Sequence, residues 1–97
     1  MPLNQENATD EAAFAYIADC QVREPLISSV TLEMESIYEV EALMELASES
    51  METARTDFAE AIRTQRSSDA LGHALQIKNM KALQEKLQKI VSSYRNR

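Results

Sequence analysis

The chain has 97 residues and a net charge of −6, with one glycine, two prolines, one cysteine and no tryptophan. A chain this short forms one small domain with a modest core, so a partner chain can supply part of the core. No apolar run is long enough to span a membrane, and the N-terminus lacks the basic and apolar regions of a secretory signal peptide. A lone cysteine excludes an intrachain disulfide, so we expect a cytoplasmic protein.

Abundant Ala, Leu, Glu, Gln and Met favour an all-α fold. We predict a single helical domain over residues 1–97, in which 1–8 are disordered. A short helix is expected over 10–23, followed by a long antiparallel hairpin over 29–66 and 69–94. The two long helices are expected to pack as in a coiled coil.

The first helix has a candidate N-cap at Thr9, with Asp10 and Glu11 in the first turn, where negative charge suits the helix dipole. Its apolar residues form an irregular face. Pro25 disfavours helical geometry at Glu24, which ends the helix before that position.

A seven-residue repeat runs through the second helix and predicts one apolar stripe along its length. The members of the stripe are Val30, Ile37, Val40, Met44, Ala47, Met51, Ala54, Phe58 and Ala61. Ser28 or Ser29 can cap this helix. Its first half carries further apolar side chains outside the stripe, whereas its second half adds little beyond Ile62. The first half therefore needs cover from more than one side.

The third helix follows a turn predicted near residues 65–69, where Ser67 or Ser68 can cap it. A continuous helix through this region is the alternative. Apolar residues then recur at alternating spacings of three and four, which indicates one buried stripe. This stripe comprises Met80, Leu83, Leu87, Ile90 and Tyr94, with Ile77 and Val91 beside it.

Charge is divided between the two parts of the chain. Residues 1–60 contain fourteen acids and two bases, whereas residues 61–97 contain eight bases and two acids. We expect the acidic and basic helices to lie side by side, which reduces the repulsion within each. Because the third helix is shorter than the second, it would leave the first half of the second helix bare. The first helix is expected to fill that gap, and a partner protein is the alternative.

Candidate partner-binding residues lie on both long helices. Those of the second helix are apolar or aromatic residues outside its stripe, and those of the third helix belong to its stripe. They are Leu32, Met34, Tyr38, Leu43, Leu46, Met80, Leu83 and Leu87. Methionine suits adaptable surfaces, and an outward-facing tyrosine is a modest sign of a contact site. The alternative for the methionines is an ordinary place in the core.

No motif for catalysis, a cofactor or a metal is recognised. His73 is the single histidine, and its setting only faintly resembles a phosphotransfer helix, so an ordinary helical histidine is the simpler interpretation. Cys20 has neither a neighbouring base nor a second cysteine. The glutamates lack the Glu-x-x-His pairs of carboxylate-bridged metal bundles. We therefore expect a protein that is not an enzyme.

Two segments are similar to parts of a known family. Thr53-Ala54-Arg55-Thr56-Asp57-Phe58, then a turn with serine and aspartate, and Leu83-Gln84-Glu85-Lys86-Leu87 resemble small helical components of type III secretion systems. These are the hairpin chaperones of needle subunits, and the needle and inner-rod subunits. The resemblance covers residues 45–97. It implies a protein that shields or presents the amphipathic helix of a partner.

The sequence thus predicts a helical protein-binding module, of chaperone or adaptor type, that packs an apolar stripe against a partner helix. A self-assembling structural subunit, and hence a homo-oligomer, is one alternative. A regulatory binder of a basic protein or nucleic acid is another, although the acidic part of the chain disfavours nucleic acid.

Overall fold

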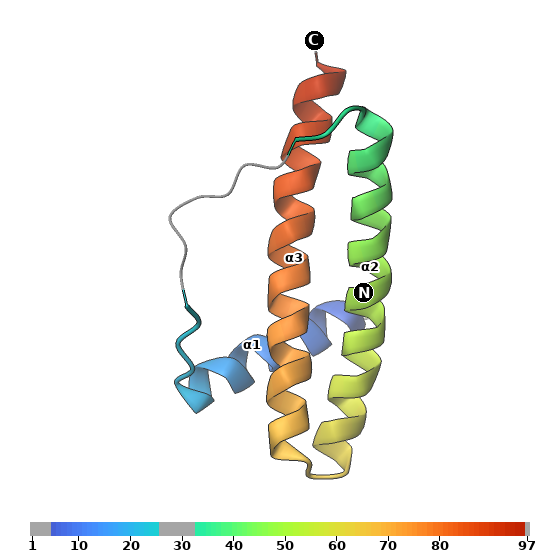
Figure 1. Cartoon of the computed structure of the whole chain (residues 1–97). Coiled ribbons are helices and arrows are strands. Elements are labelled where there is room, and N and C mark those ends of the chain that lie inside the picture. The colour runs from blue at the N-terminus through green and yellow to red at the C-terminus, as the bar shows by residue number, and fades with distance from the viewer. Residues whose placement is uncertain (1–4, 26–32, 97) are drawn as a thin grey trace.

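The computed structural model describes residues 5–25 and 33–96, which form three α-helices (Figure 1). These are α1 (Gln5–Cys20), α2 (Ile37–Arg63) and α3 (Ser67–Arg95). Helices α2 and α3 lie side by side and antiparallel, and α1 crosses behind them in the view of Figure 1. The prediction of an all-α fold, with a long hairpin and a shorter N-terminal helix, is confirmed.

Helix α2 begins later than the predicted residue 29, because its N-cap is Ser36 rather than Ser28 or Ser29. The Ser36 hydroxyl accepts a hydrogen bond from the Glu39 N–H at 3.4 Å, and the Glu39 carboxylate accepts one from the Glu35 N–H at 2.8 Å. This arrangement resembles a capping box and satisfies N–H groups that have no partner inside the helix. Residues 33–36 are not helical, and 29–32 lie outside the described residues.

Most of the described apolar stripe of α2 is buried as its heptad pattern predicts, and Ile37 and Met44 are half-buried. Its fully buried members are Val40, Ala47, Met51, Ala54, Phe58 and Ala61, and all of them are less than 6% exposed. Small residues at every second stripe position let α3 approach closely.

The connection between α2 and α3 is shorter than predicted and spans residues 64–66. The Arg66 N–H donates to the Ala61 carbonyl at 2.8 Å, and the Gln65 N–H donates to the Ile62 carbonyl at 3.2 Å. This pair of bonds is a Schellman motif, and it places Gln65 in the left-handed region with φ of 60°. Because this motif ends α2 tightly, α3 starts at Ser67, and no side chain caps it.

The buried stripe of α3 differs from the predicted one. It consists of Ala70, Ala74, Ile77, Leu87 and Val91. Ile90 and Tyr94 are about half exposed, at 50% and 53%. The prediction is wrong here because the buried stripe begins at Ala70 and Ala74 near the start of α3, and small alanines contribute little to a hydrophobicity pattern. Gly72 lies inside α3, as expected for a helix over 69–94.

Helix α1 starts and ends earlier than predicted. Residues 5–8 are helical rather than disordered, and 1–4 lie outside the described residues. The helix ends at Cys20, and Gln21 follows in the left-handed region with φ of 54°. Pro25 is therefore not what ends it.

Helix α1 does not cover the first half of α2, so the expected gap-filling arrangement is wrong. It packs instead on the half of the hairpin near the turn. There Ala13 and Ile17 join a core cluster with side chains from both long helices, which are Met51, Ala54, Phe58, Ala61, Ala70, Ala74 and Ile77. The open half has a second, smaller cluster of buried side chains, made of Val40, Leu87 and Val91. Since α2 and α3 are of similar length, α3 itself spans the whole of α2.

Candidate functional site

A buried carboxylate fixes α1 on the hairpin. Asp10 is 1% exposed and accepts two hydrogen bonds from the Arg55 guanidinium, both at 2.8 Å. The Lys81 ammonium lies 3.3 Å from the same carboxylate. Asp10 thus joins α1 to both α2 and α3, and we call these three residues the Asp10 clamp. Hydrogen bonding from Arg55 is the main cause that lowers the pKa of Asp10, against the opposing effect of its burial.

Aromatic contacts complete the attachment of α1. The Tyr16 ring meets the Phe58 ring edge-to-face, with 5.9 Å between ring centroids. The Tyr16 hydroxyl also donates to the Ser67 carbonyl at 3.1 Å. The Lys81 ammonium lies 5.6 Å from the centroid of the Phe14 ring. The turn half of the hairpin is therefore closed on one side by specific contacts.

In the part of the chain that the structure describes, no helix lies over the opposite side of the hairpin. Ser50 and Gln76 face each other there, since the Gln76 amide donates to the Ser50 hydroxyl at 2.7 Å. Arg55 follows Ser50 by five residues, and Lys81 follows Gln76 by five. At 3.6 residues per turn, five residues rotate a side chain by about 140°. The Asp10 clamp and the Ser50–Gln76 bridge therefore lie on opposite faces, and we call the second one the open face.

Four apolar side chains lie on the open face next to the Ser50–Gln76 bridge. One turn and two turns before Ser50 are Leu46 and Leu43, and one turn and two turns after Gln76 are Met80 and Leu83. Met80 packs against the core cluster near the turn, whereas Leu43 and Leu83 pack against the smaller cluster of the open half. Leu46 is 61% exposed, and the other three are half-buried. We call this set the open-face patch.

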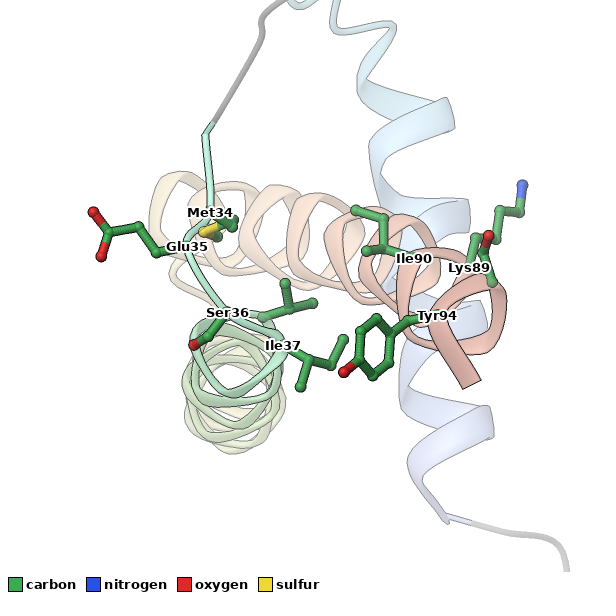
Figure 2. A pocket seen from close by; sticks show the side chains of 9 residues that line it. Met34, Glu35, Ser36, Ile37, Lys89, Ile90 and Tyr94 are labelled. Carbon is green, nitrogen blue, oxygen red and sulfur yellow. The ribbon is translucent and has the colours of Figure 1, made fainter. Parts of the chain in front are cut away.

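A second apolar feature lies at the open end of the hairpin. Residues 33–36 cross in front of α3 in Figure 1, and a hollow of about 480 Å³ lies between them, α2 and α3. Figure 2 shows Ile37 and Tyr94 beside each other in this hollow, with Ile90 nearby and Glu35 and Lys89 pointing away. We call it the end hollow. Its volume is within the range of about 300–1,000 Å³ that is typical of ligand pockets.

The predicted partner-binding residues divide between these features and the core. Leu43, Leu46, Met80 and Leu83 make up the open-face patch. Met34 lines the end hollow, and Leu87 is buried beneath it. Tyr38 is 77% exposed on α2, and Leu32 lies outside the described residues.

Charged residues border the open-face patch differently on its two helices. Along α2, Glu49 follows Leu46 by three residues. Along α3, Lys86 follows Leu83 by three residues. Residues three apart are neighbours on a helix surface. Both charged side chains are exposed.

The sequence reasoning missed the Asp10 clamp and the end hollow. It placed Asp10 in a first turn, where its charge served only the helix dipole. A usable signal was that Arg55 is one of only two bases among the first sixty residues. A lone cation inside an acidic apolar helix indicates a specific carboxylate partner. The capping pattern Ser36-x-x-Glu39, which closes one side of the end hollow, was also readable.

The residues with the most reactive side chains are scattered. His73 is half-buried on α3, and Cys20 is exposed at the end of α1. Within the described ranges, no group of three or more His, Cys, Asp or Glu residues comes together to hold a metal ion. In the same part of the chain, no helix is long and apolar enough to cross a membrane.

Comparisons with protein-family models, with curated proteins and with solved structures find no match to this chain.

Proposed function

We propose that this protein is a non-enzymatic protein-binding module, of adaptor or chaperone type, whose open face binds an amphipathic helix of a partner. The single observation that carries this proposal is the exposed Leu46 side chain within the open-face patch. Leu46 is 61% exposed on α2, and an amphipathic helix of a partner can cover such a side chain through its own apolar residues at i, i+3 or i+4, and i+7.

The packing of α1 on only one face of the hairpin supports the proposal. The molecule is only 19 Å thick along its shortest axis, which is close to two layers of helix at about 10 Å each. The hairpin and α1 account for both layers, so residues 5–25 and 33–96 form no third layer over the open face. An apolar patch that no element covers is typical of a protein–protein contact.

A direct test identifies what contacts Leu46 in the native host. A photo-crosslinking amino acid is placed at position 46, and at position 52 as a control, where Glu52 is exposed on α2 away from the patch. We expect one protein to be crosslinked from position 46 and not from position 52. Equal crosslinking from both positions would contradict a specific site.

The affinity of that protein is then measured against matched variants. Leu46→Ser should weaken binding by about tenfold, since burying a leucine side chain contributes about 1.5–3 kcal/mol and 1.4 kcal/mol is tenfold in affinity. Ile62→Ser is the control, because Ile62 is an exposed apolar residue of the same helix that lies outside the patch. The same loss in both variants would point to general destabilisation.

A self-assembling structural subunit is the second candidate. It is favoured by exposed apolar side chains at both ends of the hairpin, Ile62 near the turn and Ile90 and Tyr94 at the open end. Such end-to-end contacts are heterologous and would build filaments. Light scattering measures the weight-average molar mass. A molar mass that rises with protein concentration in the wild type, but stays at the monomer value in Tyr94→Ser, would favour this function over the first.

The third candidate, binding of a basic protein or of nucleic acid through the lysines of α3, has less support. Lys78 pairs with Glu24 at 2.8 Å, and Lys81 belongs to the Asp10 clamp. These two cations therefore stabilise the fold. A role in type III secretion and a cytoplasmic location stay predictions from the sequence.

A further inference from the structure

We propose that the surface of the hairpin beneath α1 is a binding site for an acidic amphipathic helix. In this proposal α1 occupies the site within its own chain, and the helix of a partner protein exchanges for it. The surface lies on the opposite face of the hairpin from the open-face patch, so the inference does not depend on the function proposed above. It starts from the charges that hold α1 in place.

Three bases of the hairpin hold α1 and the residues that follow it. Arg55 of α2 and Lys81 of α3 both contact the Asp10 carboxylate. Beyond the end of α1, the Glu24 carboxylate accepts a hydrogen bond from the Lys78 ammonium at 2.8 Å. Figure 1 shows α1 crossing both long helices in their turn half. The attached segment therefore has a carboxylate on a base near each of its ends.

Charge complementarity indicates what kind of helix this surface accepts. Residues 5–25 contain five acids and one base, whereas the hairpin presents Arg55, Lys78 and Lys81 to them. Opposite potentials across an interface select the partner and speed its approach. An acidic helix is therefore favoured over a neutral or basic one at this surface.

The side chains that α1 buries define the pattern that an exchanging helix needs. Asp10 is 1% exposed, Ala13 has no exposed surface and Ile17 is 8% exposed. These positions, i, i+3 and i+7, lie along one face of a helix. Ala13 and Ile17 pack in the core cluster near the turn. A matching helix thus carries a carboxylate, a small residue three positions later and an aliphatic residue four positions after that.

The hairpin keeps most of its own core when α1 leaves. Of the nine buried members of the core cluster near the turn, α1 supplies two, Ala13 and Ile17. Among the described residues, the cluster at the open end includes none from α1. Elements with few buried apolar contacts open at a lower free energy than the core of a fold. We therefore expect α1 to leave the surface while α2 and α3 stay packed.

The connection between α1 and α2 decides how strongly α1 competes with a partner. Sixteen residues, 21–36, join the two helices. A flexible tether of this kind holds α1 at an effective concentration on the order of millimolar. The affinity of a free helix is lowered in proportion to the fraction of molecules in which the site is open. In the wild type, α1 is therefore an intramolecular inhibitor of this site.

The test measures how a labelled peptide with the sequence of residues 5–25 binds to the full chain, by fluorescence anisotropy under reducing conditions. We expect the Asp10→Asn chain to bind this peptide roughly tenfold more tightly than the wild type does, because its own α1 competes less well. Glu11→Gln is the matched control, since Glu11 is an exposed acid of the same helix. Equal affinity of these two variant chains would overturn the inference.

Variants of the peptide test the chemistry of the occupant. A peptide with Asp10→Asn should bind the Asp10→Asn chain roughly tenfold more weakly than the wild-type peptide does, because it offers no carboxylate to Arg55 and Lys81. A peptide with Glu11→Gln should lose much less affinity. Equal weakening in both peptides would mean that net charge alone decides, and would overturn the pattern assigned to the occupant.

Hydrogen exchange of the wild-type chain tests the release of α1 without any substitution. The protection factor of the Ile17 amide should be roughly tenfold or more below that of Ile77, which has no exposed surface. The difference should grow as sodium chloride is added, because the ions screen the attachment. Equal protection of the two amides would mean that α1 leaves only when the whole chain unfolds, and would overturn the inference.

A second copy of the chain is another source of an acidic helix, since each copy carries α1. Exchange of α1 between two copies would give a dimer. We expect the wild type to stay monomeric at micromolar concentration, because the tethered α1 outcompetes a second copy there. A micromolar dimer that Asp10→Asn abolishes would show that a second copy, and not a partner protein, supplies the helix, and would overturn the assignment.

Discussion

The two halves of the hairpin share one heptad stripe on α2 and differ in what covers them. Near the turn, the stripe meets alanines of α3 and is closed by α1, so that Ile77 and Ala74 have no exposed surface. At the open end, the buried cluster has three members, and half-buried side chains surround it. The turn half is therefore the more tightly packed part of the fold, and the open half has the smaller buried cluster.

The number of apolar side chains on a surface does not by itself decide where a helix packs. The open half carries more apolar side chains outside the stripe, yet α1 packs on the turn half. The reason is that the turn half offers small residues for close approach and two cations for the Asp10 carboxylate. Placing that carboxylate elsewhere would leave it without these partners, and an unpaired buried charge is costly.

The largest expected effect compares core truncations in the two halves. Ile77→Ala should lower the free energy of unfolding by about 4 kcal/mol, and Leu87→Ala by about 2 kcal/mol, because a well-enclosed site cannot collapse around the cavity. Urea denaturation of both variants gives the values. Equal losses would mean that the open half is packed as tightly as the turn half.

The Asp10 clamp gives the next largest effect. Asp10→Asn should lower the free energy of unfolding by about 3 kcal/mol, since it leaves two cations facing a neutral amide in a largely buried site. Glu11→Gln is the matched control, because Glu11 is an exposed acid in the same helix. A change in Asp10→Asn no greater than in this control would show that apolar contacts alone hold α1.

Acidification should remove the free energy of unfolding that the Asp10 clamp contributes. The pKa of Asp10 in the folded protein lies below its ordinary value of 3.8, so the clamp stabilises fully above that value and loses its effect as pH falls through the folded-state pKa. The stability difference between wild type and Asp10→Asn should be constant at neutral pH and shrink below about pH 4. A difference that grows on acidification would contradict the assignment. Denaturation curves measured across this pH range provide the check.

The smallest effect concerns the turn that defines the well-packed half. Gln65→Gly should raise the free energy of unfolding by about 0.5–1 kcal/mol, because glycine adopts the left-handed conformation without the strain of a side chain. Thr64→Gly is the control, since Thr64 has a φ of −97° and gains nothing from glycine. Thermal unfolding measures both, and no gain at position 65 would show that the motif carries no strain.

Much of the fold was predictable from local patterns. The heptad in α2 and the turn near Ser67 were enough for an antiparallel hairpin, because helix propensity and periodicity act over a few residues. Helix boundaries were less accurate. The start of α2 depended on a side-chain cap at Ser36, and the phase of α3 depended on alanines that a hydrophobicity pattern ranks weakly.

The position of α1 was beyond reach from the sequence. It depends on Asp10, Arg55 and Lys81, which are far apart in the chain and look like ordinary surface charges. Four of the candidate binding residues lie one or two turns from the Ser50–Gln76 bridge, and their spacing along each helix was readable. The side of the hairpin that α1 occupies was not readable.

By itself, the sequence determined the helices, their stripes and the division of charge, since each of these is a property of residues close together in the chain. Only the tertiary structure decided which half of the hairpin is covered. That choice depends on a carboxylate meeting two cations from different helices, and no periodicity within one helix encodes such a meeting.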